Sequence, residues 1–161
     1  MNEAVAFVQK HRNKGALLDA NLLLVYLVGK FDKNRLSDFH HTKQYVEDFP
    51  LIVRLIESFS RIHTTPNVLT EVSNLGGKLG PKFFDVLQRA VVVLEEHYCA
   101  SEKAVREMQF RKLGLTDSGL LSVAARVLIV TTDWQLHGIL RSKNIDAVNF
   151  HHLRSLAAGL S

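Results

Sequence analysis

The feature that most constrains the fold is a series of very short apolar runs, each followed by a segment with helical periodicity. In the stretch LIVTTD, Leu128, Ile129 and Val130 lead through two threonines to Asp133. Apolar runs this short are typical of strands buried on both faces, as in a parallel sheet. Strands that alternate with helices imply right-handed crossovers and helices on both sides of the sheet. The sequence therefore predicts an α/β fold: a three-layer α/β/α sandwich with a central, mainly parallel sheet.

The expected elements cover nearly the whole chain. Strands are expected at residues 16–18, 62–65, 128–130 and 147–150. Helices are expected at residues 2–13, 21–28, 48–59, 66–75, 81–94, 101–114, 116–124 and 134–143. Residues 31–45 have mixed charge and no clear period, so they are expected to form a loop or a short helical excursion. Because no repeat, low-complexity tract or linker interrupts this pattern, we expect a single domain over residues 1–161.

Composition excludes some classes of protein. The longest strongly apolar stretch, residues 22–28, is far shorter than the roughly 20 residues of a membrane-spanning helix. The N-terminal stretch MNEAVAFVQKHRNK places its basic residues after the apolar ones, which is the wrong order for a secretory signal. Cys99 is the single cysteine, so no internal disulfide can form, and we expect a cytoplasmic protein in which Cys99 is a small buried side chain. The net charge of +4 is compatible with binding a polyanion.

Acidic residues occur where the expected strands end or helices begin. Asp19 ends the first strand, Asp133 ends a later one, and Asp117 begins a helix that leads into the strand at residues 128–130. Helix capping alone explains each aspartate when it is taken singly. Glu71 lies on the flank of an apolar helical stripe, where a carboxylate is costly unless it meets a cation or reaches solvent. An ion pair with Lys78 is the simple alternative for Glu71.

Four carboxylates gathered in one place would repel one another and raise one another's pKa values. A divalent cation removes that repulsion, and ligands that are all oxygen favour Mg²⁺ or Mn²⁺ over zinc. No cysteine pair or HExxH spacing indicates a zinc site. The eight histidines are scattered along the chain, and His40-His41 and His151-His152 are interpreted as surface pairs.

Four stretches together resemble the four motifs of the PIN domain, in the same order. They are LLDANLLLVYL (17–27), TPNVLTEVSNL (65–75), LTDSGLLSVAA (115–125) and VTTDWQL (130–136). The resemblance implies a PIN-like fold and an Mg²⁺- or Mn²⁺-dependent endoribonuclease. It also implies that the catalytic and metal-binding residues are Asp19, Glu71, Asp117 and Asp133. Asn21 and Thr131 match polar positions that would orient carboxylates or waters from outside the ligand set.

The resemblance bears on partners too. Many small stand-alone PIN proteins are toxins of toxin–antitoxin pairs, so a small antitoxin covering the acidic cleft is one expected partner, beside RNA. The helices beginning near Leu51 and Phe83 offer a partner or homodimer surface, although burial in the protein's own core explains them equally well. No membrane partner is expected.

An RNA substrate needs basic residues around the acidic centre. The candidates are Lys78, Lys82, Arg106, Arg111 and Lys112, each of which has a solvated helix face as its simpler explanation. Trp134 and Phe110 receive no role, because an aromatic residue near a helix start more often belongs to the core.

Two other classes of function remain open. A non-catalytic RNA-binding or scaffolding domain would keep the fold and basic surface without binding metal. A receiver-like phosphoacceptor domain would place an acidic pair after its first strand and a lysine after its last, and the sequence shows neither clearly.

Overall fold

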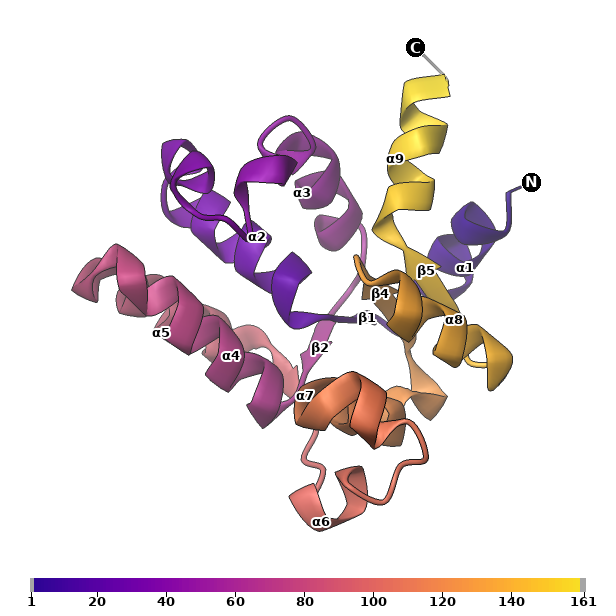
Figure 1. The fold of residues 1–161 in the computed structure, drawn as a ribbon. Helices are drawn as coiled ribbons and strands as arrows, with labels where there is room; N and C mark the ends of the chain where they lie inside the picture. The colour runs from indigo at the N-terminus through magenta and orange to yellow at the C-terminus, as the bar shows by residue number, and fades with distance from the viewer. Residues whose placement is uncertain (1, 160–161) are drawn as a thin grey trace.

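The centre of the protein is a five-stranded, all-parallel sheet flanked by helices (Figure 1). The computed structural model describes residues 2–159. The strands are β1 (Ala16–Leu18), β2 (Ile62–Thr64), β3 (Glu95–Glu96), β4 (Leu128–Thr131) and β5 (Ala147–Asn149), in the order β3-β2-β1-β4-β5. This arrangement confirms the predicted α/β class and the parallel sheet.

The register of the central strands decides what meets at the carboxyl edge of the sheet. Leu18 of β1 lies opposite Val130 of β4, and Leu17 lies opposite His63 of β2. The backbone N–H of Asp19 donates to the carbonyl of Val130 at 3.1 Å. The residues that follow β1 and β4 therefore leave the sheet side by side.

The helices divide into groups around this sheet. Their bounds are α1 (Glu3–His11), α2 (Ala20–Phe31), α3 (Phe49–Glu57), α4 (Pro66–Gly76), α5 (Pro81–Val93), α6 (Ser101–Ala104), α7 (Phe110–Val123), α8 (Trp134–Ser142) and α9 (Phe150–Gly159). Helix α2 contacts α3, α4 and α5, and α7 contacts both α4 and α8, as the neighbouring labels in Figure 1 show. Helices α1 and α9 contact each other and β5. In residues 2–159, no helix is both long and apolar enough to cross a membrane.

The helical layer around α2 is held by two contacts between a glycine and an aromatic ring. A Cβ atom built on Gly29 would lie 2.1 Å from the Phe49 ring, and one built on Gly76 would lie 2.1 Å from the Phe83 ring. Both rings belong to the buried core. Because neither glycine has a side chain, the helices can approach closely at these two points.

Helix α3 and the first part of α5 bury their apolar side chains inside this chain. Ile52 and Leu55 of α3 are buried, as are Phe83 and Leu87 of α5. The last turn of α5 differs, since residues 92 and 93 are valines with 81% and 78% of their surface exposed. A partner or homodimer surface on these helices stays a prediction.

The connection between β3 and β4 differs most from expectation. The predicted helix at 101–114 is wrong: α6 ends at Ala104 after four residues, and α7 begins only at Phe110. Gly114 bends α7 through a left-handed conformation (φ 74°), which a glycine adopts without strain. Strand β3 and helix α9 were not predicted.

Residues 31–45 form a short helical excursion, one of the two expected outcomes. They contain the 3-10 helices η1 (Lys33–Asp38) and η2 (Lys43–Tyr45). Leu36 and Tyr45 are buried, so this excursion belongs to the packed core. Cys99, expected to be buried, is only half-buried, because it lies in the exposed connection between β3 and α6.

Candidate active site

Asp19 stands at the carboxyl end of β1 and is fixed by four hydrogen bonds. Its Oδ1 accepts from the N–H of Leu22 at 2.7 Å, so Asp19 caps helix α2. Its Oδ2 accepts from Thr131 Oγ1 at 2.5 Å and from the N–H and Oγ1 of Thr132 at 2.7 and 3.3 Å. Burial raises the pKa of this carboxyl, and the hydrogen bonds oppose the rise. The side chain is therefore rigidly oriented.

Asp133 stands in the matching position after β4. Its Oδ1 accepts from the N–H of Leu136 at 2.8 Å and caps helix α8. Its own N–H donates to Thr131 Oγ1 at 2.9 Å. Thr131 is thus a link between the two aspartates, since its hydroxyl donates to Asp19 and accepts from the backbone of Asp133. Both aspartates therefore cap a helix, as the simpler explanation expected, and both also line the site.

Asp117 and Glu71 come from two helices that pack against each other. Helices α4 and α7 are in contact, and Glu71 lies on α4. Asp117 follows the bend at Gly114, which turns the second part of α7 in a new direction. Within residues 2–159, Glu71 does not form the alternative ion pair with Lys78. Both carboxylates instead line a common pocket.

The pocket has a volume of about 260 Å³, and its walls include all four acids of the predicted quartet. The remaining walls are Ala20, Asn21, Leu113, Gly114, Leu115 and Thr116. Burial raises the pKa of Asp117 to about 7, and the negative charges of the other three acids add to the rise. Among residues 2–159, no lysine or arginine lines this pocket. The site therefore carries a concentration of negative charge that its own walls do not neutralise.

The carboxylates are close, but they are not drawn together into a tight ligand shell. Among residues 2–159, no three of these acids bring carboxylate oxygens within 4.8 Å of one another. Such spacing suits an oxygen-ligand cation that keeps several waters, as Mg²⁺ does. The donor set therefore fits Mg²⁺ or Mn²⁺ held partly through water.

The five basic residues predicted to bind substrate lie outside the pocket walls. All five are exposed: Lys78, Lys82, Arg106, Arg111 and Lys112. Arg106 forms an ion pair with Glu102, one turn earlier in sequence, so a simple surface role explains it. Arg111 and Lys112 directly precede Leu113, which is part of the pocket wall. Of the set, these two lie closest to a wall residue along the chain.

The expectation that an aromatic residue at this helix start belongs to the core is wrong for Trp134. Its side chain is 54% exposed, directly after Asp133. The indole stacks on His151 with ring centroids 5.8 Å apart and meets His152 edge-on at 4.9 Å. The histidine pair is thus part of an aromatic cluster at the start of α9, where the sequence indicated only a surface pair.

Sequence reasoning missed some residues. Thr132 donates both its N–H and its hydroxyl to Asp19, although only Thr131 was assigned an orienting role. The sequence TTD could have indicated this role of Thr132, because two adjacent hydroxyl residues at a strand end can both reach a neighbouring carboxylate. A group formed by His63, Glu95 and His97 was also missed, because it depends on the unpredicted strand β3.

No protein-family model matches the chain, and a search of curated proteins finds no match.

Proposed function

We propose that this chain is a PIN-domain endoribonuclease that uses Mg²⁺ or Mn²⁺ at the carboxyl edge of its sheet. The resemblance of four stretches to the PIN motifs, in order, suggested this function from sequence. The α/β fold with a parallel sheet is compatible with it. The acids of the four motifs, which are up to 114 residues apart in the chain (19 to 133), line one pocket.

The observation that carries the proposal is the electrostatic state of Asp117. Its pKa is raised to about 7 by burial and by the three other carboxylates, with no cationic side chain in the pocket wall. An arrangement of like charges is costly unless a cation completes it. Perturbed carboxyl groups in a pocket are also typical of functional sites.

The residues have distinct roles in this proposal. A bound cation would supply a water of lowered pKa and would stabilise charge on the phosphoryl oxygens. Asp117 and Glu71 offer carboxylate oxygens from the two helices, whereas Asp19 is fixed by its hydrogen bonds and gives the site its geometry. Asp133 is held in place because it caps α8, and it would bind the cation either directly or through a water. Thr131 and Thr132 keep Asp19 oriented throughout.

Single-stranded RNA is the form of substrate that the surface favours. Trp134 is exposed next to Asp133, and an unpaired base can stack on such a ring. Arg111 and Lys112 lie beside the pocket wall and would neutralise backbone phosphates. A toxin role would add a small antitoxin that covers the pocket.

The test is cleavage of a mixed pool of structured and single-stranded RNA with Mn²⁺ or Mg²⁺. Wild type is compared with Asp117→Asn and with Asp85→Asn, an exposed acid on α5 that serves as a matched control. We expect cutting that requires metal, persists in the control and falls at least about 100-fold in Asp117→Asn.

Two outcomes would overturn the proposal. Cutting that survives a chelator, or that is equal in wild type and Asp117→Asn, would come from another source. If neither protein cuts and neither binds Mn²⁺ in a titration, the function is that of a non-catalytic RNA-binding or scaffolding domain.

A further inference from the structure

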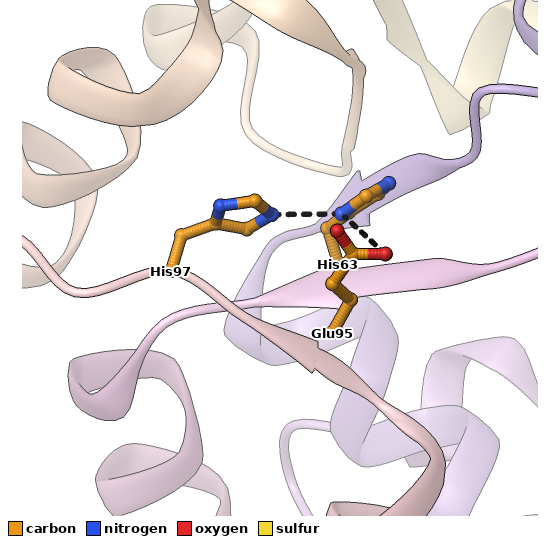
Figure 2. Close-up of side chains that lie close together, drawn as sticks. All are labelled: His63, Glu95 and His97. Atoms are coloured by element: carbon orange, nitrogen blue, oxygen red, sulfur yellow. Dashed lines mark hydrogen bonds and ion pairs between the residues drawn. The ribbon is translucent and has the colours of Figure 1, made fainter.

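A second group of metal-ligating side chains lies outside the walls of the acidic pocket, on the edge strand β3 and its neighbour β2. His63 of β2 lies opposite Glu95 of β3, and His97 follows two residues later (Figure 2). Because side chains alternate along a strand, Glu95 and His97 point to the same side. The N–H of His97 also donates to the Thr64 carbonyl at 2.9 Å, which continues the pairing beyond β3.

The three side chains turn toward one another. His63 Nδ1 lies 2.8 Å from His97 Nε2 and 3.9 Å from Glu95 Oε2. Within the described part of the chain, residues 2–159, this is the one group of three histidine, cysteine or acidic residues whose ligand atoms all lie within 4.8 Å of one another. Figure 2 shows both imidazoles and the carboxylate converging on the same small volume.

The chemistry of His63 selects the nitrogen that would bind a metal. His63 Nε2 lies 2.8 Å from the Lys14 carbonyl, which can only accept, so Nε2 carries the proton. In the neutral ring Nδ1 then carries a lone pair and no proton; without metal this lone pair accepts the hydrogen bond from His97 Nε2, and Nδ1 also faces Glu95. Metal-binding histidines in proteins usually donate their other N–H to a carbonyl or carboxylate. His63 is only 4% exposed, so this orientation is held by packing.

We propose that His63, Glu95 and His97 form a site for Zn²⁺ or a similar imidazole-binding divalent cation. Two nitrogen ligands and one carboxylate oxygen are a known zinc donor set, with a fourth position left for water. Bonds of about 2.0–2.1 Å at tetrahedral angles separate ligand atoms by about 3.4 Å. The observed 2.8 and 3.9 Å bracket this value, so each contact needs to change by only about half an ångström.

The site would stabilise the edge of the sheet and has no part in the proposed cleavage. Strand β3 has only two residues, both exposed, and pairs with β2 alone. A cation bound by residues of both strands would fix this edge. Arg61, whose Nη1 lies 3.2 Å from Glu95 Oε2, would have to share or release that oxygen. The inference is independent of the nuclease proposal, since none of the three residues lines the acidic pocket.

The test is isothermal titration of the full chain with Zn²⁺ in the Asp117→Asn background, which weakens competition from the acidic pocket. Into this background His97→Ala or Glu95→Gln is introduced, and both positions are accessible to solvent, so neither change opens a hole in the core. His41→Ala, from an exposed histidine pair, is the matched control.

We expect one Zn²⁺ per chain, at least about tenfold weaker binding in each ligand variant and unchanged binding in the control. Amide hydrogen exchange at His97 should also slow when Zn²⁺ is added to the background protein. Failure to bind Zn²⁺ at micromolar concentration, or binding that His97→Ala leaves unchanged, would overturn the proposal.

Discussion

The acidic pocket and the histidine group both lie at neighbouring parallel strands, yet they are built in opposite ways. The pocket gathers four oxygen donors of like charge, and the pKa of Asp117 rises to about 7 as a result. The histidine group combines nitrogen donors with one carboxylate and already contains a 2.8 Å hydrogen bond between its rings. The walls of the acidic pocket supply no compensating positive charge. The histidine group, by contrast, has its own hydrogen bond between the rings without any metal.

The difference lies in what holds each side chain in place. Asp19 and Asp133 are fixed by helix N-termini and by Thr131, so they cannot move apart to reduce their repulsion. His63 is fixed by a backbone carbonyl, and its neighbours approach from a short edge strand. Hard, well-hydrated cations suit the first arrangement, and imidazole-binding cations suit the second.

The largest effects are expected from a crossed pair of variants, one at each of the two sites. Asp117→Asn should lower Mn²⁺-dependent RNA cleavage at least about 100-fold and leave Zn²⁺ binding at the histidine group intact. His97→Ala should do the reverse, with cleavage within about twofold of wild type. Both variants are measured in both assays. Loss of both properties in one variant would mean that the two sites are coupled.

The link between the two aspartates is tested by Thr131→Val, with Thr132→Val as its control. Thr131→Val removes a 2.5 Å hydrogen bond to Asp19 and the acceptor for the Asp133 N–H. Thr132→Val removes a 3.3 Å contact to Asp19 and a side-chain hydrogen bond with Tyr45, and it keeps the backbone donor to Asp19. We expect Thr131→Val to lower the free energy of unfolding by about 1–3 kcal/mol and cleavage by about tenfold. Denaturant unfolding and the cleavage assay measure these changes. Equal effects of the two substitutions would show that Thr131 has no special role.

The uncompensated charge of the pocket predicts a pH dependence of stability in metal-free protein. Asp117 has a pKa of about 7 in the folded state, against the ordinary value of 3.8 for an aspartate. Asp117 therefore binds its proton more tightly in the folded state than in the unfolded state. The stability that this protonation contributes is present below about pH 4 and is lost as the pH rises through about 7. Asp117→Asn should remove it, so at pH 8 the variant should be more stable than wild type by about 1–3 kcal/mol. Denaturant unfolding at several pH values with a chelator tests this, and parallel curves for the two proteins would contradict it.

The smallest expected effect concerns the basic residues beside the pocket. Replacing Arg111 and Lys112 together by Ala should weaken RNA binding by about threefold to tenfold and reduce its dependence on salt, because each removed phosphate contact lowers the salt slope. Lys33→Ala, at an exposed lysine of η1 outside the pocket walls, is the control. An unchanged salt slope in the double variant would place the RNA path elsewhere.

Sequence pattern was sufficient for the buried strands and failed at the exposed edge. Strands β1, β2, β4 and β5 are largely buried, and all four were predicted from the sequence. Strand β3 is the pair Glu95–Glu96, which has no apolar pattern because neither side chain is buried. It is a strand only because β2 offers it backbone partners, which is a tertiary effect. The break between α6 and α7 was missed for a similar reason, because the residues between Ala104 and Phe110 favour helix locally.

The same distinction separates the two candidate sites. Asp19 and Asp133 could be predicted because they come one and two residues after the end of an apolar strand, and the topology then brings them together. The histidine group depends on the pairing of β2 with β3, whose partners are 32 residues apart (63 and 95), and no local pattern indicated that pairing. The open spacing of the carboxylates could not be predicted either, since it depends on how far the bend at Gly114 displaces Asp117.

The contact between Gly76 and the Phe83 ring has a consequence for how sequences of this fold can diverge. A side chain at position 76 and an aromatic ring at position 83 exclude each other, because the added Cβ would lie 2.1 Å from the ring. The same holds for Gly29 and Phe49. In any homologue that keeps this helical layer, a side chain can replace either glycine only if the facing aromatic ring changes as well. Two correlated pairs, neither with any chemistry of its own, would therefore mark shared descent even where the acids have been lost.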